Sequence, residues 1–135
     1  MNEVFEFLRQ NPIYYIATVD GEQPHVRPFG SVAKFEGNLY ILTSNEKDVF
    51  QQIQNNANIE LGALGKRGEW LRVTAKAIAD PRREAKVHML AEYPNLGYSP
   101  DDKYVEVLYL KDATATFYQF GRDHSLSGKP RTVKF

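Results

Sequence analysis

The chain has 135 residues, of which 42% are hydrophobic and 13% aromatic, and its 17 basic and 17 acidic side chains cancel to zero net charge. This length and composition predict one globular domain spanning residues 1–135. The balanced charge argues against a nucleic-acid-binding or membrane-surface protein, because either would carry a basic excess. Little charge repulsion opposes self-association, which favours a chain that pairs with itself.

The absence of cysteine excludes disulfide bonds, thiolate metal sites and a cysteine nucleophile. The three histidines, His25, His88 and His124, show no metal-ligand spacing, so no metal site is expected. The N-terminal residues lack the basic start and apolar run of a signal peptide. No stretch approaches the ~18 apolar residues of a membrane span. We therefore expect a cytoplasmic protein with neither a membrane nor a nucleic acid as its partner.

The first half of the chain opens with a helix signal and continues with strand signals. Residues 2–10 predict a helix with one apolar face and Asn2 as its N-cap. β-branched and aromatic residues predict three strands, over residues 13–19, 26–35 and 39–43. The turns between them are too short for crossovers, so these strands should form an antiparallel meander.

The second half carries two more helix signals among further strands. Residues 44–56 predict a helix capped by Ser44 or Asn45. Residues 69–79 alternate strictly between apolar and polar side chains, as a strand does, and Asp80-Pro81 ends that strand and begins a helix of about ten residues. The remaining clear strand signals cover residues 59–64, 104–110 and 113–120, and residues 132–135 could add a terminal strand. The fold class is mainly β with short helices, in which six or seven mostly antiparallel strands close into a barrel.

The junction between a strand and a helix at residues 43–47 is the first candidate site. Thr43 and Ser44 offer hydroxyls, Lys47 offers an ammonium group, and a helix N-terminus offers unpaired N–H groups with partial positive charge. Together they could hold a phosphate. The alternative is an ordinary helix cap with a solvated lysine.

The second candidate is the segment from His25 to Gly30. Pro28 removes a ladder donor and so belongs at an edge or a bulge, while Gly30 allows close backbone approach. A flat ligand could then lie against Pro28 and Phe29, with Arg27 reaching an anion. An edge strand without a ligand explains the same residues.

Two further segments could carry chemistry. Trp70 beside Arg72 could stack on an aromatic ligand or form a dimer contact. Arg122 and His124 could bind an anionic substrate, or they could belong to a solvated loop.

Five stretches in order resemble the pyridoxamine 5′-phosphate oxidase-like family of FMN-binding split barrels. They read YIATVDG, PHVRP, LYILTS followed by Lys47, NANIEL and WLRV, and the resemblance covers roughly residues 10–80. It implies a split β-barrel that forms a homodimer and binds FMN at the subunit interface.

The resemblance also implies roles for individual residues. Arg27, Pro28 and Phe29 would line the isoalloxazine ring, and Thr43, Ser44 and Lys47 would hold the phosphate of the ribityl chain. Trp70 and Arg72 would approach the flavin from the same or the partner subunit.

The C-terminal part departs from the family pattern. Pyridoxamine phosphate oxidases carry an Arg- and Trp-rich C-terminal signature, which only Arg122 and His124 echo here. We therefore expect an FMN-dependent oxidoreductase of the general FMN-binding or nitroreductase-like kind, with a small-molecule electron donor and acceptor. No catalytic residue is assigned, because hydride transfer to the flavin needs none. The alternatives are a flavin-binding module for electron transfer or sensing, and a related barrel that binds haem or a deazaflavin.

Overall fold

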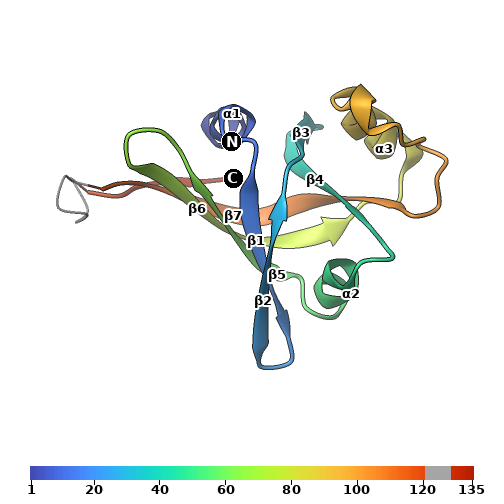
Figure 1. The fold of residues 1–135 in the computed structure, drawn as a ribbon, viewed down its shortest axis with the longest axis horizontal. Helices are drawn as coiled ribbons and strands as arrows, with labels where there is room; N and C mark the ends of the chain where they lie inside the picture. Colours follow the sequence, from blue (N-terminus) through green and yellow to red (C-terminus); the bar gives the residue numbers. More distant parts are fainter. Residues whose placement is uncertain (121–128) are drawn as a thin grey trace.

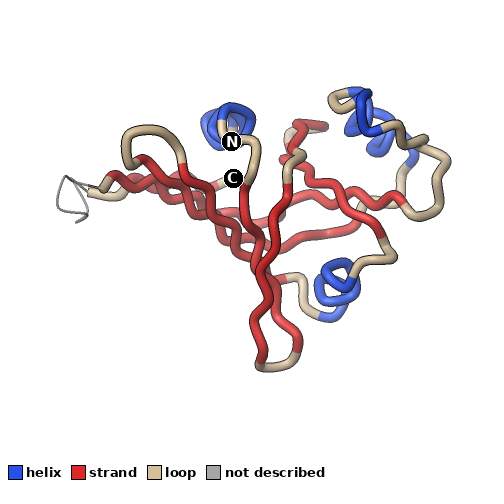
Figure 2. Tube along the Cα trace, in the orientation of Figure 1, coloured by secondary structure: helices blue, strands red, loops and turns tan. Residues whose placement is uncertain are grey.

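The computed structural model describes residues 1–120 and 129–135, and Figures 1 and 2 show their arrangement. These residues form α1 (Asn2–Gln10), β1 (Tyr14–Asp20), β2 (Gln23–Phe29), β3 (Val32–Phe35), β4 (Asn38–Ser44), α2 (Asp48–Asn55), β5 (Asn58–Leu64), β6 (Glu69–Ala79), α3 (Arg83–Ala91), a 3-10 turn η1 (Pro94–Leu96), β7 (Val105–Gln119) and β8 (Arg131–Lys134). The predicted mainly β fold with short helices is confirmed. None of the described helices has the length and apolar content needed to cross a membrane.

The strands form one antiparallel sheet in the order β2-β1-β5-β6-β7-β4-β3, with β8 added beside β7. The chain passes from β2 directly to β3, so the Gly30-Ser31 connection joins the two ends of this order. Such a connection gives the split-barrel arrangement that the sequence predicted. The described residues contain eight strands, where six or seven were predicted.

The prediction of a single strand over residues 26–35 was wrong. It divides at Gly30 and Ser31 into β2 and β3, which lie at opposite ends of the sheet. The Ser31 carbonyl accepts a hydrogen bond of 2.8 Å from the Tyr14 hydroxyl. This long-range bond satisfies the carbonyl outside any strand ladder, and nothing in the local sequence signals it.

The prediction of separate strands over residues 104–110 and 113–120 was also wrong, because β7 runs through both. At the break Asp112 takes a left-handed conformation, with φ of 52°. Ala113 then exchanges two backbone hydrogen bonds with Phe135, of 2.8 and 2.9 Å. Phe135, which directly follows β8, therefore pairs with β7 at the position where the sequence predicted a break between two strands.

The predicted helix caps were wrong at two places. The cap of α1 is Met1 rather than Asn2, and α2 begins at Asp48 with Lys47 as its N-cap, four residues later than predicted from Ser44. Residues 44–47 form a turn instead, in which the Lys47 N–H donates to the Ser44 carbonyl at 3.1 Å. Lys47 thus lies at the start of the helix rather than inside it.

The first part of β7, over residues 105–110, carries buried side chains on both of its faces. Leu108 and Leu110 pack in the main core with α1, α2 and the inner faces of β1, β5 and β6. Val107 points the other way, into a smaller cluster with Tyr40 on β4 and Met89 on α3. In Figure 1, α2 lies on the opposite side of the ribbon from α1 and α3.

A network of charged and polar side chains lies directly after the C-terminal end of β6. The Asp80 carboxylate is 5% exposed, accepts a hydrogen bond of 2.7 Å from the Tyr40 hydroxyl and pairs with Arg82 at 2.9 Å. Hydrogen bonds from Arg82 lower the pKa of Asp80 to about 2. Burial and the Asp80 carboxylate raise the pKa of Tyr40 to about 12. The carboxylate is thereby kept charged inside the fold.

Replacing Asp80 by asparagine should lower the free energy of unfolding at pH 7 by about 1–3 kcal/mol, because Arg82 and Tyr40 lose a charged acceptor. The folded pKa lies below the unfolded value, so the contribution is full above pH ~4 and is lost as the pH falls through about 2. Urea unfolding at several pH values measures both effects. Asp101→Asn is the control, since the Asp101–Arg83 pair is exposed and should leave stability unchanged. Equal acid sensitivity in wild type and Asp80→Asn would contradict the role of this carboxylate.

Candidate functional site

A cavity of about 550 Å³ lies where β2, β4 and the segment before β7 meet. Pro28 and Phe29 form one wall, and Thr43, Ser44 and Lys47 form another. These five residues were all predicted as cofactor ligands from two separate segments of the sequence. The Gly30-Ser31 connection brings the segments together, because it carries the end of β2 past the end of β4.

Thr43 is the most informative residue of the cavity. Its side chain is 7% exposed, and its Oγ1 atom is buried without a hydrogen-bond partner among the described residues. A buried hydroxyl that lacks a partner costs about 1–3 kcal/mol. The neighbouring Ser44 Oγ accepts a bond of 3.2 Å from the Glu46 N–H, which leaves the Ser44 proton available for donation. Thr43 and Ser44 therefore each carry a hydroxyl hydrogen that no described residue accepts.

Lys47 links this cavity to a second hollow of about 640 Å³ between β2 and α2, because it lines both. As the N-cap of α2, the Lys47 backbone lies at the positive end of the helix dipole. Glu46 and Asp102 also line the first cavity, so among its described lining residues Lys47 is the one cation beside two carboxylates.

Arg27 lines the second hollow rather than the cavity of Pro28 and Phe29. Its guanidinium donates to the Thr18 hydroxyl at 2.8 Å, to the Gln52 side-chain oxygen at 2.7 Å and to the Ile16 carbonyl at 3.2 Å. Burial lowers the pKa of Arg27, and the nearby Asp48 carboxylate partly opposes that shift. The structure thus groups Arg27 with Lys47.

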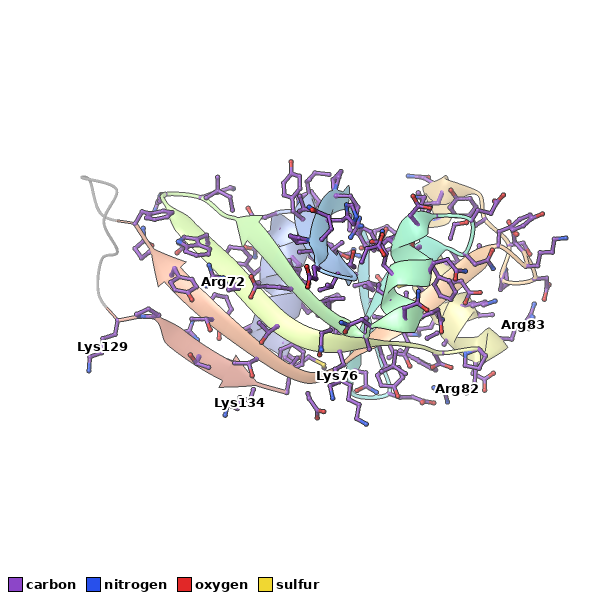
Figure 3. All side chains as sticks on the ribbon, turned by 90° about the horizontal axis from the view of Figure 1, so that it is seen from below. Arg72, Lys76, Arg82, Arg83, Lys129 and Lys134 are labelled. Carbon is purple, nitrogen blue, oxygen red and sulfur yellow. The ribbon has the colours of Figure 1, made fainter. Side chains whose placement is uncertain are left out.

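Trp70 and Arg72 lie far from the cavity within one chain. Trp70 pairs in register with Tyr118 on β7, whereas Thr43 pairs with Glu106 on the same strand. At about 3.3 Å per residue, the span from Glu106 to Tyr118 is about 40 Å along the strand. Figure 3 shows Arg72 on this part of the sheet, well apart from Arg82 and Arg83.

Around Trp70 the side chains form an aromatic and cationic stack. The Trp70 ring lies 4.0 Å from the ring of Tyr118 and 5.7 Å from that of Phe120. The Arg72 guanidinium lies 5.2 Å from the Trp70 ring, and Arg72 pairs with Glu60 at 3.6 Å. The remaining predicted residues, Arg122 and His124, lie outside the described residues.

Sequence reasoning missed one wall of the cavity, which the end of η1 and the segment between η1 and β7 provide. Leu96, Tyr98 and Tyr104 line it and are 44%, 54% and 42% exposed. Gly97, with φ of 72°, turns the chain between Leu96 and Tyr98. Exposed apolar side chains in a proline-containing loop were the available signal, since such residues mark binding surfaces.

Comparisons with known proteins place the chain in a family. The model of the pyridoxamine 5′-phosphate oxidase family matches residues 1–117. A NimC/NimA family protein from Clostridium acetobutylicum is 37% identical, with 100% of this chain and 92% of that chain covered and a TM-score of 0.91. A search of curated proteins found no match.

More distant structures share the fold. A pyridoxamine 5′-phosphate oxidase-related, FMN-binding protein from Nostoc punctiforme is 14% identical, with 98% of this chain and 95% of that chain covered and a TM-score of 0.62. A Bacteroides thetaiotaomicron protein, named for a proposed role in 5-nitroimidazole antibiotic resistance, is 17% identical over 86% of this chain and 82% of its own, with a TM-score of 0.59. The match over residues 1–117 and the 37% identity confirm the resemblance: this chain belongs to the pyridoxamine 5′-phosphate oxidase family.

Proposed function

We propose that this chain binds FMN in the cavity between β2, β4 and the segment before β7, and that it acts as an FMN-dependent oxidoreductase. The observation that carries the proposal is the buried Thr43 hydroxyl, which has no partner among the described residues and lines the cavity with Ser44 and Lys47. The FMN-binding protein from Nostoc punctiforme, which shares the fold, supports the choice of cofactor.

The residues present suit the two chemically different ends of FMN. Two hydroxyls and the Lys47 ammonium can donate to phosphate oxygens, and charge-assisted bonds of this kind are the strong ones. Pro28, Phe29, Leu42 and Tyr104 supply the apolar surface that a flat ring needs. Bound FMN would supply hydride-transfer chemistry, while the chain binds the cofactor, orients it and excludes water.

Purified protein tests the cofactor directly. We expect a yellow protein that absorbs at ~450 nm, either as isolated or after addition of FMN. Denaturation should release the flavin into solution. A colourless protein that takes up no added FMN would overturn the proposal.

Turnover separates an enzyme from a flavin carrier. Because the Bacteroides thetaiotaomicron protein is named for nitroimidazole resistance, a nitroaromatic compound is the first electron acceptor to test, followed by a quinone. NAD(P)H-driven reduction of either acceptor by the FMN-loaded protein would support an oxidoreductase. Flavin binding without turnover would favour the electron-transfer or sensing module.

Replacing Thr43 by valine should separate ligand binding from stability. The change removes a hydroxyl without a partner and keeps the shape of the side chain, so the ligand-free protein should lose no stability. Affinity for FMN should fall by about 1 kcal/mol, or roughly fivefold. Thermal unfolding without ligand and FMN titration measure the two effects. A loss of stability with unchanged FMN affinity would contradict the assigned role.

We further propose that two copies pair through the outer face of the sheet and place the flavin at their interface. On this face Tyr15, Val26 and Leu64 are 53%, 67% and 68% exposed, and the strand register puts all three on one side. Apolar side chains gathered in this way are typical of an interface. Within one chain, Trp70 and Arg72 lie far from the cavity. In a dimer, Trp70 and Arg72 of one copy could approach the cavity of the other copy.

Leu64→Asp should shift the protein towards monomer and weaken FMN binding, because a buried carboxylate in the interface lacks a partner. Sedimentation velocity at several concentrations, combined with FMN titration, checks this. Val87→Asp on α3 is the control, since Val87 is also exposed but lies on a helix away from that face. A wild-type monomer with full FMN occupancy would contradict the shared site.

A further inference from the structure

Gln52 on α2 takes part in hydrogen bonds with side chains of the neighbouring strands β1 and β2. Its side-chain oxygen accepts from the Arg27 Nη2 group at 2.7 Å and from the Thr18 hydroxyl. Thr18, which is 1% exposed, in turn accepts from Arg27 Nη1 at 2.8 Å. The three side chains form a closed ring of hydrogen bonds that fixes the plane of the guanidinium.

The ring leaves one particular edge of Arg27 available. A guanidinium carries five N–H donors, and those of Nη1 are used by Thr18 and the Ile16 carbonyl. Nη2 uses one donor on Gln52, and Nε makes no hydrogen bond to a described residue. The remaining donors, one on Nε and one on Nη2, lie side by side on the edge that binds carboxylate or phosphate in bidentate fashion.

The partners in this ring are neutral, which matters for an anion site. An amide oxygen and a hydroxyl hold Arg27 without cancelling its charge, whereas a carboxylate in either place would form an ion pair. Asp48 lines the same hollow as Arg27 and Lys47 and would attract a free guanidinium. Holding Arg27 by Gln52 and Thr18 keeps its positive charge available beside Lys47.

We propose that Gln52 is a positioning residue that, with Thr18, aims the open edge of Arg27 at a flavin phosphate held by Lys47, the residue that lines both hollows, and so makes the site select FMN over riboflavin. The proposal rests on the proposed function, and it goes beyond it by assigning phosphate selectivity to a residue that does not touch the cavity of Pro28 and Phe29. Riboflavin is the matched probe, since it carries the same ring and ribityl chain without the phosphate.

The test is the dissociation constant of FMN and of riboflavin for three variants and the wild type. Gln52→Met keeps the length of the side chain and removes the acceptor; it should raise the Kd for FMN about tenfold and leave that for riboflavin within about twofold. Gln54→Met is the control, because Gln54 lies on the same helix, is exposed, lines neither hollow and makes no side-chain hydrogen bond to a described residue. It should change neither constant.

Gln52→Glu tests the same role if the Gln52→Met variant folds poorly. The carboxylate would pair with Arg27, so the ligand-free protein should melt at an equal or higher temperature. The Kd for FMN should nevertheless rise about a hundredfold, because the charge of Arg27 is cancelled and the phosphate is repelled. A structural role for Gln52 could not produce higher stability together with weaker FMN binding and unchanged riboflavin binding.

The outcomes separate this inference from the proposed function. If the wild type binds neither flavin, the proposed function fails and the role of Gln52 fails with it. If the wild type binds FMN, but the Gln52 variants keep that affinity or lose FMN and riboflavin by the same factor, the cofactor assignment stands and the positioning role is overturned.

Discussion

Replacing Lys47 by alanine is expected to weaken FMN binding by about 1–3 kcal/mol, which is roughly a 5- to 150-fold rise in Kd. Lys47 lines both the cavity of Thr43 and the hollow of Arg27, and it caps the positive end of α2. Its ammonium group is therefore placed to pair with a phosphate from either side. FMN titration by fluorescence measures the change.

Lys134→Ala is the matched control for this variant, since it removes the same charge from exposed β8 (Figure 3). It should leave the Kd for FMN unchanged. Added salt should weaken binding in the wild type more than in Lys47→Ala, because ions screen the charge pair. Unchanged FMN affinity in Lys47→Ala would instead leave this lysine as an ordinary solvated helix cap.

Leu108→Ala is expected to lower the free energy of unfolding by about 2–5 kcal/mol, the range for large-to-small changes in a packed core. Leu108 is fully buried on β7, opposite Ile41 of β4 and Ala79 of β6. Because β7 is buried on both faces around Leu108, little can move to fill the resulting cavity.

Urea unfolding compares this variant with Val87→Ala, in which the truncated valine is 41% exposed and lies on α3, away from the proposed interface. The exposed site should cost less than about 0.5 kcal/mol. Similar losses in the two variants would contradict the placement of β7 at the centre of the core.

The elements that were predicted correctly carry their signal locally. β6 occupies Glu69–Ala79 and α1 occupies Asn2–Gln10, with the bounds expected from the sequence. In β6 the strict alternation of apolar and polar residues needs only neighbouring positions to be recognised, and the apolar stripe of α1 has the same property.

The elements that were predicted wrongly depend on distant partners. The Tyr14 hydroxyl donates a hydrogen bond to the Ser31 carbonyl, at the point where β2 and β3 separate. Phe135 pairs with Ala113, where β7 continues through its bend. Each bond joins residues far apart in the sequence. The local pattern at residues 26–35 is that of one strand, and only the tertiary fold divides it.

The candidate site divides in the same way. Side-chain chemistry alone predicted Thr43, Ser44 and Lys47 as ligands, and the fold places Pro28 and Phe29 in the same cavity. The positions of Trp70 and Arg72 depend on the register of β6 against β7, which no local pattern specifies. The sequence did not predict a role for Gln52, because glutamine is common on the exposed face of a helix. Only the structure shows its hydrogen bond to Arg27.

A crystal structure of the chain with bound FMN tests the central claim most directly. The phosphate is expected within hydrogen-bond distance of Thr43 Oγ1 and the Lys47 ammonium, with the ring in the cavity that Pro28 and Phe29 line. Flavin bound away from this cavity, or a cavity that stays empty at saturating FMN, would contradict the account.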